Sequence, residues 1–290
     1  MTILVTGATG TIGSRLLDLL SDEGVRPRAL VRDPDRAAGV VRDRADLVQG
    51  DLAEPASVRA ALAGVDRVFL VSANGPDQVH HEQAVIDAAS AVGLDRLVKV
   101  SASGAHPEAS NAFWRAHSEV EAYLAATGVP SVLLRPTFLM SNLLAASTPI
   151  RERGLLLAPA GHARIAMIDP GDVALIAARA LQDSDFEPGV LELTGPAAVT
   201  HHEVAAALTA ATGRHVSYVD VTPQDAVAGL VSAGVPEAGA REVVRVYDSL
   251  RRGDQSVPTH SVASVTGRAA TPLAEFVAAH ASAFTERVAG

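Results

Sequence analysis

Short runs of aliphatic and β-branched residues alternate with longer segments of helical periodicity along the first half of the chain. This alternation is typical of parallel strands joined by helices that cover both faces of one sheet. Six runs predict strands, at residues 2–6, 27–32, 46–50, 66–72, 95–101 and 130–135.

Apolar positions spaced by three and four predict helices between these strands. Segment 77–92 has this spacing, and segment 120–128 ends on Gly128, which is a typical residue after a helix. Six strands with intervening helices indicate the α/β class with a Rossmann-like, doubly wound parallel sheet. We expect residues 1–150 to form this dinucleotide-binding domain.

The regular alternation of strand-like and helix-like segments becomes less clear after Pro136. Segment 151–162 contains glycine and proline and predicts loops. A helix is expected from Asp169-Pro170, a β-like run at 190–195, and a capped helix from Thr200, which has Glu203 three residues later. The tail is mainly helical. We therefore expect 151–290 to return to the sheet edge and to form a small substrate lobe over its carboxyl edge.

Composition narrows the classes of partner. The 290 residues carry a net charge of −9, and the basic residues are scattered, which argues against nucleic acid and anionic membranes and favours small molecules. The absence of cysteine excludes disulfides and thiolate nucleophiles. No basic leader or long apolar run is visible, so a cytoplasmic protein is expected.

Three glycines, Gly7, Gly10 and Gly13, follow the first predicted strand directly and open a helix. In such a strand–turn–helix unit, glycines permit the tight turn, the approach of a pyrophosphate and close helix–strand packing. The helix N-terminus adds unpaired N–H groups. We expect this turn to bind a dinucleotide through Gly7, Thr9, Gly10, Thr11, Ile12 and Gly13.

The choice of dinucleotide depends on the end of the second strand, where Arg32 stands. An arginine there pairs with a 2′-phosphate, so NADP(H) is preferred over NAD(H). Arg32 as a solvated charge, and Asp33 as a partner of a 2′-hydroxyl, are the alternatives, and Arg36 is a second candidate. Asp51 and Leu52 end the third strand and would flank the adenine, although an aspartate there also caps helices.

The motifs TGATGTIG, VRDPDRA, VSANG, KVSASGA, LLRPTFLMSN and IDPGDVALIAARAL together resemble the NmrA-like group of atypical short-chain dehydrogenases/reductases. The likeness covers nearly the whole chain and is to the branch of NADPH-dependent quinone oxidoreductases and triphenylmethane reductases. It implies that the cofactor cleft is also lined by Ser72, Ala73 and Asn74 and, on its nicotinamide side, by Pro136 and Phe138.

The Tyr-x-x-x-Lys pair of ordinary short-chain dehydrogenases is missing, because the only lysine, Lys99, follows no tyrosine by four. The equivalent helix carries His117 and Glu121 on one face, a replacement that the resemblance makes a family trait. Three roles stay open for His117: a general acid oriented by Glu121, a contact to the nicotinamide ribose, or a structural brace.

Serines at the end of the fifth strand, Ser101 and Ser103, occupy the place of a catalytic serine, or they form a turn. Lys99 shares a face with Ser101 by strand alternation. Substrate contacts are expected near the cleft mouth, although each of the larger side chains there also suits core packing; the candidates are Ser103, Trp114, Phe138, Met140 and Tyr247.

The pairs His80-His81 and His201-His202 do not have metal-ligand geometry, so no metal site is expected. The resulting hypothesis is an NADPH-dependent reductase of quinones or similar planar acceptors, for which a homodimer is a possible assembly. The alternatives are a non-catalytic NADP sensor of the NmrA type, or a carbonyl reductase or epimerase with a different proton donor.

Overall fold

Seven parallel strands form the central sheet in the computed structural model, which describes residues 1–41 and 43–285. Their order is β3-β2-β1-β4-β5-β6-β8, which confirms the predicted Rossmann-like α/β fold. The strands are β1 (Ile3–Val5), β2 (Arg28–Val31), β3 (Asp46–Gln49), β4 (Arg67–Leu70), β5 (Arg96–Val100), β6 (Ser131–Pro136) and β8 (Gly189–Leu193).

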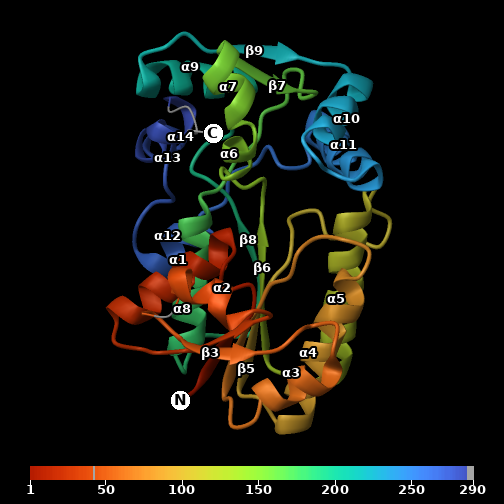
Figure 1. Cartoon of the computed structure of the whole chain (residues 1–290), viewed down its shortest axis with the longest axis vertical. Coiled ribbons are helices and arrows are strands. Elements are labelled where there is room, and N and C mark those ends of the chain that lie inside the picture. The colour runs from red at the N-terminus through yellow and green to blue at the C-terminus, as the bar shows by residue number, and fades with distance from the viewer. Residues whose placement is uncertain (42, 286–290) are drawn as a thin grey trace.

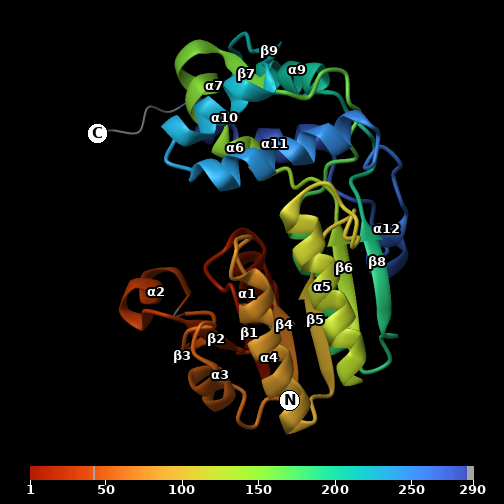
Figure 2. The same cartoon turned by 90° about the vertical axis from the view of Figure 1, so that its right-hand side faces the viewer.

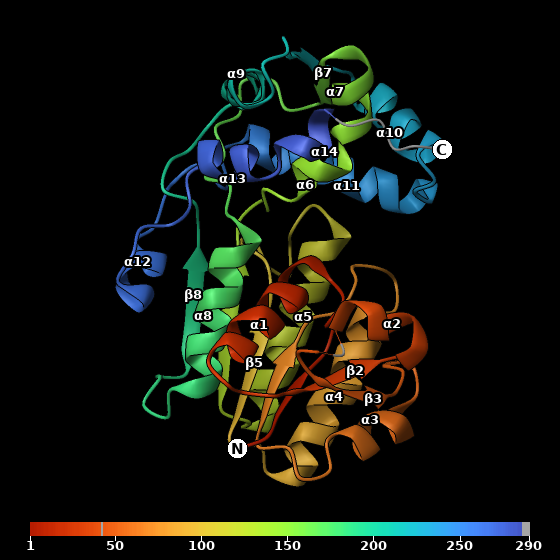
Figure 3. The same ribbon diagram turned by 60° about the vertical axis from the view of Figure 1, so that its left-hand side comes forward.

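Helices cover both faces of this sheet (Figures 1 and 3). One face packs against α1 (Thr11–Asp22), α2 (Pro34–Val41), α8 (Pro170–Gln182) and α12 (Ser261–Thr266). The other packs against α3 (Pro55–Ala61), α4 (Gln78–Val92) and α5 (Ala112–Thr127). Buried aliphatic side chains fill both interfaces, which explains why the strands read as near-continuous hydrophobic runs.

A separate lobe sits over the end of the sheet at which the strands finish (Figure 2). Its buried apolar side chains form a third cluster that includes Met140, Ile150, Leu208 and Phe276. The lobe consists of α6 (Asn142–Ala145), α7 (Ser147–Arg153), β7 (Leu155–Ala158), α9 (His201–Thr212), β9 (Ser217–Asp220), α10 (Pro223–Ser232), α11 (Glu237–Arg251), α13 (Leu273–Ala279) and α14 (Ala281–Thr285).

One sequence expectation about strands needs correction, and a second is made more specific by the structure. Segment 151–162 was expected to be loop, but it contains β7, which pairs in parallel with β9. The β-like run near 190–195 is a full member of the main sheet, because β8 pairs with β6 and extends the six expected strands to seven. The expected domain boundary at residue 150 lies inside α7. The buried apolar core of the lobe also includes two residues before that boundary, Met140 and Leu143.

Helix starts agree with their predicted caps. The carboxylate of Asp169 accepts a hydrogen bond from Gly171 N at 2.7 Å, and α8 begins at Pro170. Thr200 and Glu203 form a reciprocal capping box at the start of α9. Within the described ranges, no helix is both long and apolar enough to cross a membrane.

Two buried arginines hold the C-terminus of α8 against the amino ends of β4 and β5. Arg67 Nη1 donates to Leu181 O at 2.7 Å. The Arg96 guanidinium donates to the carbonyl oxygens of Ala180, Asp183, Ser184 and Phe186. These bonds satisfy carbonyls that a helix end leaves unpaired and place positive charge at the negative end of the helix dipole.

Candidate functional site

The glycine turn connects β1 to α1 at the carboxyl end of the sheet. Gly7 has a φ of +57°, and its carbonyl oxygen accepts a hydrogen bond from Gly10 N at 2.9 Å. A Cβ on Gly13 would lie 2.8 Å from the carbonyl carbon of Gly7 and closer still to its oxygen. The turn therefore has the tight backbone packing that only glycine permits at these two positions.

Open backbone donors follow this turn. Gly10 is the N-cap of α1 and supplies no side chain, and the first hydrogen bond of the helix runs from Ser14 N to Gly10 O at 2.9 Å. Among residues 1–41 and 43–285, no acceptor meets the N–H groups of Thr11, Ile12 and Gly13. Thr9, Gly10 and Thr11 are exposed, whereas the Ile12 side chain belongs to the core. Such a helix start can bind an anion.

Arg32 directly follows β2 and is exposed, and its guanidinium has no hydrogen-bond or ion-pair partner in the described part of the chain. Asp33, by contrast, accepts a hydrogen bond from Arg36 N at 3.0 Å and so caps α2. Asp51 Oδ1 accepts from Ala53 N at 3.0 Å, which is a turn contact, and Leu52 packs against the α3–α4 core. The exposed Arg32 guanidinium is suited to a phosphate.

The end of β4 is tied to the end of β1 beside the turn. Thr6 Oγ1 donates to Val71 O and accepts from Val71 N, both at 2.8 Å. Ser72 follows and is half-buried, and Ala73 and Asn74 are exposed. The glycine turn and the segment that begins at Ser72 therefore lie side by side at the sheet edge where a doubly wound fold binds its ligand.

A buried polar cluster lies under this edge, between the sheet and helices α4 and α5. We call it the Lys99 cluster; its members are Ser72, Gln78, Glu82, Lys99 and His117. Lys99 Nζ forms an ion pair with Glu82 Oε2 at 2.7 Å, and both side chains are 0% exposed. Lys99 Nζ also lies 3.2 Å from His117 Nδ1, and Ser72 Oγ donates to Glu82 Oε1 at 2.8 Å.

This environment determines the charge of His117. Burial, and secondarily the nearby Lys99 ammonium, hold the pKa of His117 well below its usual value of 6.5. Because an ammonium can only donate, the facing Nδ1 atom accepts, and the ring is neutral. An imidazolium acid at neutral pH is thus at odds with the geometry.

Glu121 bonds to different partners from His117. Its carboxylate accepts from Arg135 Nε at 2.9 Å and from Ser101 Oγ at 2.5 Å, and no hydrogen bond joins it to His117 among the described residues. Ser101 is 3% exposed, so its hydroxyl lies in the helix–sheet interface. Of the three roles left open for His117, an acid oriented by Glu121 therefore disagrees with the geometry, because each side chain contacts a charged residue of the sheet instead.

The ends of β5 and β6 meet the lobe at Gln255, a buried side chain that sequence analysis missed. Gln255 Nε2 donates to Ser103 O at 2.9 Å, and its Oε1 accepts from Phe138 N at 2.7 Å. Pro136, at the end of β6, accepts from Ser103 N at 2.9 Å. The Phe138 ring packs on Tyr247 of α11, with 5.9 Å between ring centroids. Ser103, Phe138 and Tyr247 are all half-buried where the sheet meets the lobe.

The other two substrate candidates, Trp114 and Met140, are buried. Trp114 is 7% exposed and packs against Gly104, and Met140 is 1% exposed. Met140 contributes to an apolar lobe cavity of about 280 Å³ that is also lined by Met167 and Leu273. The Trp114 side chain therefore serves packing, whereas Met140 borders the lobe cavity.

Sequence reasoning also missed Gln78 and Glu82. Both lie on the buried face of α4, four residues apart, where apolar residues are expected. A polar pair in that stripe, together with a lysine inside the apolar run of β5, is the signal that could have found the cluster.

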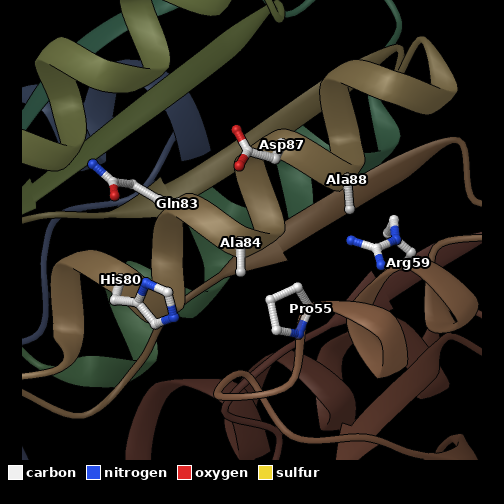
Figure 4. A pocket seen from close by; sticks show the side chains of 7 residues that line it. All are labelled: Pro55, Arg59, His80, Gln83, Ala84, Asp87 and Ala88. Carbon is white, nitrogen blue, oxygen red and sulfur yellow. The ribbon is translucent and has the colours of Figure 1, made fainter.

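The adjacent side chains of His201 and His202 have different environments in the structure. His201 is buried, which lowers its pKa to about 4, whereas His202 stacks with His162. His80 lines a small groove between α3 and α4 (Figure 4), together with Arg59 and Asp87. In the described ranges, no group of three or more His, Asp or Glu residues could hold a metal ion.

The model of the NmrA-like family matches residues 1–276. An NAD(P)H azoreductase from Xenophilus azovorans is 38% identical over 282 residues, which cover 97% of this chain and 99% of the relative.

Two solved structures are also similar. The NADPH-dependent quinone oxidoreductase from Escherichia coli, complexed with NADPH, has a TM-score of 0.86 at 29% identity and covers 96% of this chain and 99% of its own. The Citrobacter sp. triphenylmethane reductase complexed with NADP(H) has a TM-score of 0.84 at 26% identity, covering 97% and 100%. Both likenesses extend over the sheet and the lobe.

Proposed function

The chain belongs to the NmrA-like family, and we propose that it is an oxidoreductase that transfers hydride from NADPH to a quinone or a similar planar conjugated molecule. The observation that carries the proposal is the glycine turn, whose open amides begin α1 at the carboxyl edge of the sheet. The similar azoreductase, quinone oxidoreductase and triphenylmethane reductase act on conjugated acceptors.

The residues present fit NADPH. The amides of Thr11, Ile12 and Gly13 would hold the pyrophosphate, because no protein acceptor meets them within the described part of the chain. The exposed Arg32 would hold the 2′-phosphate. Segments 72–74 and 136–138 would hold the nicotinamide half. NADPH supplies the hydride, and the protein supplies binding and orientation.

No protonated histidine is needed in this reaction. A quinone or an extended conjugated cation delocalises or neutralises its charge as hydride arrives, and water can supply the later proton. His117, neutral and buried, then acts as a positioning group under the cleft. Glu121 and Ser101 join α5 to Arg135 and thereby fix the helix on the sheet.

The direct test is turnover. Purified protein is mixed with NADPH and a panel of quinones, azo dyes and triphenylmethane dyes, and the absorbance of the reduced cofactor is followed. We expect NADPH oxidation with at least one conjugated acceptor. Tight NADPH binding without oxidation by any acceptor would refute the reductase and favour the NADP sensor; turnover of simple carbonyl compounds alone would favour a carbonyl reductase.

Replacing Arg32 tests the choice of cofactor. We expect Arg32→Ala to raise the Kd for NADPH about 10- to 100-fold, the scale of one charge-assisted hydrogen-bonded pair, and to leave the Kd for NADH nearly unchanged. Calorimetric titration with both cofactors measures the two constants. Arg59→Ala is the matched control, because Arg59 is exposed on α3 and lines the groove between α3 and α4. Equal weakening of NADPH and NADH would refute the 2′-phosphate assignment.

A further inference from the structure

The Lys99 cluster contains a fully buried ion pair that the proposed hydride transfer does not itself use. Three contacts engage the Lys99 ammonium: Glu82 Oε2 at 2.7 Å, Val100 O at 3.1 Å and His117 Nδ1 at 3.2 Å. The ammonium thus combines an ion pair to Glu82 with hydrogen bonds to Val100 O and His117 Nδ1. The charge is thus held in one place by protein groups alone.

Stability alone does not account for such a pair. Removing two charges from water offsets much of their attraction, and apolar residues of similar volume often replace a buried ion pair without loss of stability. The apolar part of the same helix–sheet interface is filled by aliphatic side chains, among them Leu70 and Leu97. A methionine in place of Lys99 and a leucine in place of Glu82 would suit these apolar surroundings.

The contacts of Glu82 lead from the ion pair to the cofactor edge. While Oε2 faces Lys99, Oε1 accepts the Ser72 hydroxyl at 2.8 Å and the Gln78 amide at 3.4 Å. Ser72 stands two residues after β4, beside the end of β1, and Gln78 opens α4. One carboxylate therefore fixes both ends of the segment 72–78, which connects β4 to α4 at the carboxyl edge.

We infer that Glu82 and Lys99 are positioning residues, which hold Ser72 and the β4–α4 connection in the conformation that receives the dinucleotide. The inference rests on the proposed function in one respect, namely that this edge binds NADPH. Lys99 fixes the Glu82 carboxylate, Glu82 fixes Ser72, and neither charged side chain is exposed to contact the cofactor.

Single and paired replacements separate positioning from stability. Lys99→Met and Glu82→Leu each leave one buried charge without its partner, so each is expected to lower the melting temperature. The double variant removes both charges and is expected to regain most of that loss. It should nevertheless bind NADPH about tenfold more weakly, which corresponds to about 1.4 kcal/mol, because the Ser72 hydroxyl has lost its acceptor.

Ser72→Ala, made in both backgrounds, tests the route through Ser72. It should weaken NADPH binding in the wild-type protein and have little further effect in the double variant, because coupled residues are not additive. An unchanged Kd in the stable double variant would overturn the inference, as would a full additional loss from Ser72→Ala in that background. Should a single variant not fold, these two comparisons still decide the question.

The outcomes also separate this inference from the proposed function. Wild-type protein that does not bind NADPH would refute the proposed cofactor. Wild-type protein that binds NADPH but reduces no acceptor would refute only the reductase, because the positioning role is measured by Kd.

Discussion

Gly13→Ala should lower the free energy of unfolding by about 2–4 kcal/mol and weaken NADPH binding in the molecules that still fold. The new Cβ would lie 2.8 Å from the Gly7 carbonyl carbon and 3.1 Å from Ala8 Cα. Both are backbone atoms of the turn, so no side-chain rotation can relieve the overlap. The start of α1 must move away from β1, and its open amides move with it.

Urea denaturation measures the stability change, and calorimetric titration measures NADPH binding. Gly229→Ala provides the matched control, because Gly229 lies inside α10 and, among the described residues, a Cβ there meets no atom within 4 Å apart from its chain neighbours and the backbone of its own helix. That substitution should raise stability by up to about 1 kcal/mol through helix propensity. A Gly13→Ala protein with the wild-type denaturation midpoint would contradict the close approach of α1 to the turn.

The second large effect is expected at the opposite end of the sheet. Arg96→Met should destabilise the protein by about 3–4 kcal/mol, because four carbonyl oxygens at and after the end of α8 lose their shared donor. The methionine retains an apolar stem but offers no hydrogen bond. Thermal and urea denaturation would both report the loss.

Arg179→Met is the control for this replacement. Arg179 lies on the exposed side of α8, one turn before its end, so the same chemical change should alter stability by less than about 0.5 kcal/mol. If the two variants were equally stable, the carbonyls near Ala180 and Phe186 would not depend on Arg96, and the helix end would be held by packing alone.

Sequence analysis predicted the elements that are determined by residues close together in the chain. The six first strands are short aliphatic runs between turn residues, and the capped starts of α8 and α9 depend on residues within one helical turn. Strand β7 is different: Leu155–Ala158 stands between Gly154 and Pro159, which suggest a loop, and it becomes a strand by pairing with β9 about 60 residues later. Such pairing has no local signature.

The same distinction between short-range and long-range contacts explains which parts of the site could be predicted. The glycine turn could be predicted because its backbone requirements lie within seven residues. The partner of His117 could not, because the i, i+4 rule places Glu121 on the same face but does not weigh residues across the helix–sheet interface. Lys99 of β5 and Arg135 of β6 are charged competitors there, and they engage His117 and Glu121 separately.

The burial of Lys99 also has a consequence for the reactivity of the chain. Its ammonium is the only lysine amine among 290 residues, and it is closed to solvent. Acylating reagents, aldehydes and enzymes that modify lysine therefore find no lysine side chain on the folded surface. A covalent adduct at Lys99 would therefore show that the α4–β5–α5 interface had opened in that molecule.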